Sequence, residues 1–101
     1  MQLRPEAWDQ WVESAVGAHL LNHQYRDDYT LHYWRQGSLE VDFVLERKGK
    51  VIGLEVKRGT TAKIPGTAAF EKKCRPDKIL LVGNGGIPWQ EFLRISPADL
   101  F

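Results

Sequence analysis

The feature that most constrains the fold is an alternation of apolar and polar residues over positions 39–46. Its apolar members are Leu39, Val41, Phe43 and Leu45, and Glu40, Asp42, Val44 and Glu46 stand between them. A period of two predicts a β-strand with one buried and one polar face. A turn at 47–50 follows, and residues 51–57 predict a second strand. We therefore expect a β-hairpin.

The turn of this hairpin sets its register. With Lys48 and Gly49 as the two turn residues, Arg47 pairs with Lys50, and a four-residue loop gives the same pairing. Counting back from the turn assigns the side chains to two faces. The face expected to be buried collects Leu39, Val41, Phe43, Leu45, Ile52, Leu54 and Val56. The other face collects Glu40, Asp42, Val44, Glu46, Val51, Gly53, Glu55 and Lys57, with Asp42 directly opposite Glu55.

The remaining segments fit one α/β domain that spans residues 1–101. Apolar residues at three- and four-residue steps predict an amphipathic helix, and runs of β-branched and aromatic residues predict further strands. Helices are predicted at 6–23 and 67–74, an interior strand at 78–83, another strand at 30–36, and a final edge strand at Phe92–Ile95. The order is α-β-β-β-α-β, with a central mixed sheet flanked by helices.

Composition excludes several classes of protein. The formal net charge is +1, so only a local basic patch could hold nucleic acid. Cys74 is the single cysteine, which rules out an intrachain disulfide and argues against a cysteine-based zinc site. The apolar runs are too short to span a membrane and no signal-peptide core is present, so we expect a cytoplasmic protein without a membrane partner. Unpaired edge strands are compatible with a homodimer.

The polar face of the hairpin carries the candidate chemistry. Like charges directly opposite each other destabilise a sheet, so Asp42 and Glu55 require compensation. A bridging divalent cation or a shared proton would supply it. Lys57 projects into the same space, where a lysine could hold a water and stabilise negative charge on a phosphate.

Neighbouring residues complete this predicted cluster. With Gly37-Ser38 as a turn, Arg35 faces Glu40 and Tyr33 faces Asp42. Glu40 then lies between Arg35 and Lys57, and we interpret it as a supporting residue. Glu13, at the edge of the apolar stripe of the first helix, can join the cluster if that helix packs on the charged face.

The segment from Glu40 to Lys57 resembles the PD-(D/E)XK nuclease motif, with Asp42, Glu55 and Lys57 at the motif positions and Glu13 at the helical glutamate. The predicted element order matches the restriction-endonuclease-like core of that superfamily. The resemblance implies phosphodiester hydrolysis of DNA or RNA with Mg²⁺ or Mn²⁺. It implies Asp42, Glu55 and Lys57 as catalytic residues, and Asp42, Glu55, the main-chain carbonyl of Val56, and Glu13 as metal ligands.

More narrowly, residues 8–83 resemble the C-terminal domain of unknown function of prokaryotic AAA-type ATPases. Glu13 with the small and aliphatic residues after it, Tyr33-Trp34-Arg35, Glu40-Val41-Asp42-Phe43 and Glu55-Val56-Lys57 carry this resemblance. No Gly-x-x-x-x-Gly-Lys-Ser/Thr run is present. The chain is either a fragment of a longer ATPase or a stand-alone remnant. The alternative function is a catalytically silent module that binds nucleic acid or docks on an ATPase domain or subunit.

Basic residues cluster after the motif. Arg58, Lys63, Lys72 and Lys73 could contact a nucleic-acid backbone, and a solvated helix face explains them equally well. His19 and His23 stand four residues apart but lack the glutamate of a zinc-protease motif. We interpret both histidines as structural.

Overall fold

The computed structural model describes residues 5–56, 65–83 and 86–101, with side chains described for 10–56, 67–83 and 86–101. The strands form one four-stranded sheet in the order β1-β2-β3-β4. The pairs β1–β2 and β2–β3 are antiparallel, and β4 runs parallel to β3. The elements are α1 (Pro5–His23), β1 (Thr30–Gln36), β2 (Leu39–Arg47), β3 (Lys50–Val56), α2 (Pro65–Cys74), β4 (Lys78–Val82), α3 (Trp89–Phe92) and a 3-10 helix (Pro97–Leu100). The predicted α/β fold with a mixed sheet flanked by helices is confirmed.

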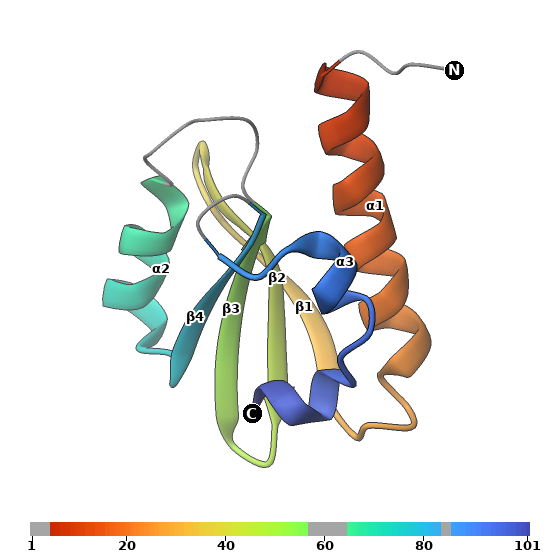
Figure 1. The fold of residues 1–101 in the computed structure, drawn as a ribbon. Coiled ribbons are helices and arrows are strands. Elements are labelled where there is room, and N and C mark those ends of the chain that lie inside the picture. The colour runs from red at the N-terminus through yellow and green to blue at the C-terminus, as the bar shows by residue number, and fades with distance from the viewer. Residues whose placement is uncertain (1–4, 57–64, 84–85) are drawn as a thin grey trace.

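The two longer helices cover opposite faces of the sheet, as Figure 1 shows. On the α1 side, buried aliphatic residues of the helix pack against β2, β3 and β4. This cluster includes Val12, Val16, Leu20, Phe43, Leu45, Ile52, Leu54, Val56 and Val82. On the α2 side, Phe70 packs with Val41 and Val44. Two layers of helix therefore bury both faces of the central hairpin.

Two glycines allow this close packing. A Cβ atom on Gly17 of α1 would lie 3.1 Å from the Phe43 ring, and one on Gly53 of β3 would lie 2.7 Å from the Phe70 ring. The second distance is shorter than a normal contact between carbon atoms. Gly53 therefore lets α2 approach the sheet at this position.

Two predictions about the end of the chain are wrong. Within the described residues, 78–82 form the last strand of the sheet, although their apolar character suggested an interior strand. This strand is apolar because both helix layers reach it, through Leu80 on one face and Ile79 on the other. The expected strand at Phe92–Ile95 is replaced by α3 and a turn, since Trp89 and Phe92 stand one helical turn apart and both join the α1-side cluster.

The register of the central hairpin follows the prediction. Arg47 pairs with Lys50, Glu46 with Val51 and Val44 with Gly53. In the preceding hairpin, Arg35 pairs with Glu40 and Gln36 with Leu39. The turns therefore fix the pairing as expected.

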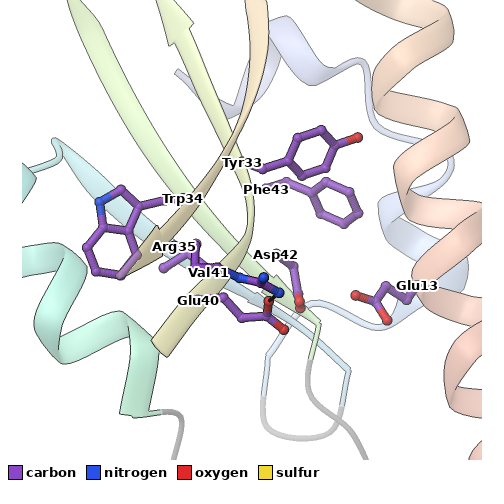
Figure 2. Close-up of a pocket in the computed structure, with 8 residues that line it drawn as sticks. All are labelled: Glu13, Tyr33, Trp34, Arg35, Glu40, Val41, Asp42 and Phe43. Atoms are coloured by element: carbon purple, nitrogen blue, oxygen red, sulfur yellow. Dashed lines mark hydrogen bonds and ion pairs between the residues drawn. The ribbon is translucent and has the colours of Figure 1, made fainter. Parts of the chain in front are cut away.

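A β-bulge in β2 changes the predicted faces. Trp34 pairs with Val41 but His32 pairs with Val44, so Asp42 and Phe43 together stand opposite one residue of β1. The bulge places Val41 on the α2 side and Phe43 on the α1 side. The prediction of one apolar face containing both is wrong. The predicted polar face is wrong as well: Val44 and Gly53 face α2, whereas Asp42 points toward α1 (Figure 2).

A buried aspartate ties the start of the sheet to the C-terminal segment. Asp27 accepts hydrogen bonds from the Ser96 hydroxyl at 2.7 Å and from the Ala98 N–H at 3.2 Å. The hydrogen bond from Ser96 is the main reason that the pKa of Asp27 is lowered. The Tyr29 hydroxyl donates to the Leu20 carbonyl, and burial raises the pKa of Tyr29 to about 12. The segment between α1 and β1 is therefore an anchored turn.

None of the helices in the described part of the chain has the length and apolar character that crossing a membrane requires.

Candidate functional site

The candidate site lies where the ladder between β2 and β3 ends. The last backbone pair of the ladder joins Phe43 to Leu54. Beyond this pair, the two strands are joined by hydrogen bonds from backbone N–H groups to carboxyl side chains. The Asp42 N–H donates to Glu55 Oε2 at 3.3 Å, and the Val56 N–H donates to Asp42 Oδ2 at 2.8 Å. The structure thus brings together the two carboxyl groups that the register placed opposite each other.

The two carboxyl groups approach from different sides of the sheet. Glu55 alternates with Leu54 and Val56, which both belong to the α1-side cluster, so its Cβ points to the α2 side. Asp42 points toward α1 because of the bulge. They meet in the gap between the strands. This arrangement differs from the predicted shared face but keeps the predicted proximity.

This proximity makes Glu55 a weak acid. Burial, the negative charge of Asp42 and a hydrogen bond to the Asp42 side chain together raise the pKa of Glu55 to about 8, and Glu13 adds to the rise. The hydrogen bond from the Asp42 N–H opposes the rise without cancelling it. Near neutral pH, in the absence of a cation, the pair therefore keeps a proton. A shared proton was one of the two compensations expected from the sequence.

A pocket of about 320 Å³ opens beside Asp42 on the α1 side of the sheet. Glu13 extends from α1 with its carboxyl group directed at Asp42 (Figure 2). It does so although α1 packs against Phe43, Leu45 and Leu54, and not on the charged face that was the stated condition for this contact. The lining residues are Glu13, Tyr33, Trp34, Arg35, Glu40, Val41, Asp42 and Phe43. The bulge therefore brings the helix glutamate and the strand aspartate to one pocket.

Glu40 has the supporting partner that the sequence predicted on β1. Arg35 Nη2 lies 3.1 Å from Glu40 Oε2, and both side chains are largely exposed. The second expected partner, Lys57, lies outside the described residues, as do Arg58 and Lys63. Arg35 therefore compensates the negative charge of Glu40, as the sequence predicted.

The oxygen atoms at this site suit a hard cation. Asp42 and Glu55 each accept one hydrogen bond from a backbone N–H, and their side chains are also hydrogen-bonded to each other. Val56, whose main-chain carbonyl the sequence proposed as a further ligand, donates its N–H to Asp42. Among the described residues, no three histidine, cysteine, aspartate or glutamate side chains are grouped closely enough to hold a metal ion. Two carboxylates with waters still fit Mg²⁺, which commonly binds in this way.

The two described lysines among the predicted nucleic-acid contacts lie elsewhere. Lys72 and Lys73 line a pocket of about 770 Å³ between α2 and the turn at 36–39. This pocket shares no lining residue with the pocket of Asp42. Lys72 and Lys73 thus line a different pocket from Asp42, and Arg58 and Lys63 lie outside the described residues.

The histidines of α1 make structural hydrogen bonds. His19 Nε2 donates to the Ile95 carbonyl, and His23 Nδ1 donates to the His19 carbonyl, each at 2.8 Å. Cys74 is an exposed thiol at the end of α2. Neither feature adds to the carboxylate site.

Comparison with known proteins yields one match. The model of a family described as a domain of unknown function, DUF4143, matches residues 9–98. This range contains Glu13, Asp42 and Glu55. No curated protein and no solved structure matches the chain.

Proposed function

The chain belongs to the DUF4143 family, a domain of unknown function found in AAA-ATPase-associated proteins, and we propose that it is a Mg²⁺- or Mn²⁺-dependent nuclease of the PD-(D/E)XK type. One observation supports the proposal: the side chains of Asp42 and Glu55 are hydrogen-bonded to each other at the end of the β2–β3 ladder, where a divalent cation would replace the proton that the pair holds. The substrate would be DNA or RNA, and the reaction would be hydrolysis of a phosphodiester.

The described residues of the proposed site have roles that follow from their positions. The hydrogen bonds from Val56 and Asp42 backbone N–H groups fix the orientation of the two carboxyl groups. A bound divalent cation would polarise the phosphate and lower the pKa of an attacking water. Glu13, directed at Asp42 from α1, would accept a hydrogen bond from a water beside the pair. Lys57 is proposed to position the attacking water.

Calorimetric titration with Mn²⁺ at pH 7 tests the site. The wild type should bind Mn²⁺ and release a proton, because the cation replaces the proton of the carboxyl pair. Parallel titrations in two buffers of different ionisation enthalpy measure that proton. Glu55→Gln should lose most of the affinity. Glu46→Gln, which changes an exposed glutamate on the same hairpin, should bind as the wild type does.

Cleavage of labelled DNA and RNA with Mn²⁺ tests the activity. Asp42→Asn should abolish cleavage, and Glu46→Gln should leave it unchanged. Equal cleavage by the wild type and Asp42→Asn would contradict the nuclease assignment.

One observation favours a second candidate, a catalytically silent module that binds nucleic acid or docks on an AAA-type ATPase. Asp42 and Glu55 satisfy two backbone N–H groups and each other, so the fold does not require a cation. A silent module would show neither millimolar Mn²⁺ binding nor metal-dependent cleavage. It would bind an ATPase subunit or nucleic acid equally well with Asp42→Asn.

A further inference from the structure

We propose that the site accepts single-stranded nucleic acid along β1, with Tyr33 stacking on a base and Arg35 holding a phosphate. This inference rests on the proposed function and specifies its substrate. Tyr33 and Arg35 line the same pocket as Asp42. They stand two residues apart on one strand, so both point to the α1 side and their Cα atoms lie about 6.5 Å apart.

Tyr33 offers a stacking surface. Its side chain is 73% exposed, although it is a large aromatic residue. Its ring centroid lies 6.0 Å from that of the buried Phe43, which supports it from below (Figure 2). Nucleic-acid bases stack on aromatic side chains held in this way, without regard to sequence. Only an unpaired base has a free face, so Tyr33 favours a single strand over a duplex.

Arg35 offers the cation that a phosphate needs. The carboxyl groups of Glu13, Glu40 and Asp42 surround the pocket, and Arg35 is the one basic residue among its described lining residues. Its ion pair with Glu40 joins side chains that are 75% and 52% exposed. Exposed pairs of this kind contribute little to stability, so a phosphate can displace Glu40 from the guanidinium. Glu40 therefore competes with the substrate for Arg35.

The position of β1 makes this surface accessible. β1 is the first strand of the four-stranded order, so within the described residues its outer side has no neighbouring strand. A strand of nucleic acid that follows this edge would pass Tyr33 and Arg35 and reach Asp42 at the bulge. The same bulge that turns Asp42 toward α1 thus aligns the binding residues with the carboxylate pair.

Fluorescence anisotropy with the full chain in EDTA tests the inference, because binding is then measured without cleavage or metal. The probes are a labelled oligothymidylate and a labelled duplex of the same length. The single strand should bind more tightly. Tyr33→Leu should weaken that binding about 5- to 150-fold. Arg35→Gln should weaken it and reduce the slope of log K against log salt by about 0.7.

Two exposed residues outside the pocket give matched controls. Tyr25→Leu and Arg94→Gln should bind as the wild type does. Glu40→Gln should bind more tightly, because it releases Arg35. These variants change exposed side chains, and equal melting temperatures would verify that each is folded.

The outcomes separate this inference from the proposed nuclease activity. A loss of affinity for the single strand that is confined to Tyr33→Leu and Arg35→Gln supports the inference, even if the wild type cleaves nothing with Mn²⁺. Tighter binding of the duplex, or equal binding by Tyr33→Leu, Tyr25→Leu and the wild type, overturns it even if cleavage occurs.

Discussion

Replacing Glu55 by glutamine should make the protein more stable at high pH. The amide keeps an oxygen for the Asp42 N–H and supplies an N–H that can donate to the Asp42 carboxyl. It therefore imitates the protonated glutamic acid. The wild type must ionise Glu55 next to Asp42 as the pH rises, and the variant carries no such charge.

The size of the effect follows from the pKa of Glu55. Its ordinary value is 4.5 and the folded protein raises it to about 8, so the folded state holds a proton that the unfolded state has released. Between these two values, stability falls as the pH rises. The full difference corresponds to an upper limit of roughly 5 kcal/mol. Because the carboxyl is partly exposed, solvent screening reduces this, and we expect roughly 2 kcal/mol.

Urea unfolding followed by tryptophan fluorescence measures this at pH 5, 7 and 9, with EDTA present. The free energy of unfolding of Glu55→Gln minus that of the wild type should increase by about 2 kcal/mol from pH 5 to pH 9. Glu46→Gln controls for the loss of one glutamate from the hairpin. A difference between Glu55→Gln and the wild type that does not change with pH would refute the reasoning.

Three further predictions concern metal binding and packing. A hundredfold excess of Mn²⁺ over its dissociation constant should raise the free energy of unfolding by about 2.7 kcal/mol in urea titrations, and Asp42→Asn should remove this gain. Gly53→Ala should cost about 1–3 kcal/mol, because the new methyl group would meet the Phe70 ring; an unchanged urea midpoint would show that the ring can move aside. Asp27→Ala should cost about 1–3 kcal/mol by leaving the Ser96 hydroxyl and its neighbours unpaired, and thermal unfolding measures the loss.

Turn geometry made much of the fold predictable. Short turns at 37–38 and 48–49 fix which residues pair, so the contact of Arg35 with Glu40 and the proximity of Asp42 to Glu55 follow from counting. These are local consequences of a period-two pattern. Such contacts need no knowledge of how the helices pack.

The bulge could not be predicted in the same way, because it depends on how β2 fits between two helix layers. One sign was present: Val44 is the apolar residue on β2 that the alternation assigned to the polar face. A break in the alternation between Val41 and Val44 would have assigned both to the α2 side, as the structure does. The structure of Phe92–Ile95 and the burial of Asp27 depend on contacts with α1 and with the C-terminal segment. These contacts join residues that are far apart in sequence.

The bulge has a consequence for how this domain can change during evolution. Deleting one residue between Val41 and Val44 would restore a regular ladder and turn every earlier residue of β2 to the opposite face. Val41 would leave Phe70, and the residues on the pocket side would exchange places with those beneath α2. Substitutions at Asp42, by contrast, keep the chain length and leave Phe43 in its place. We therefore expect natural variants to lose the carboxylate by substitution while the length of this strand stays constant.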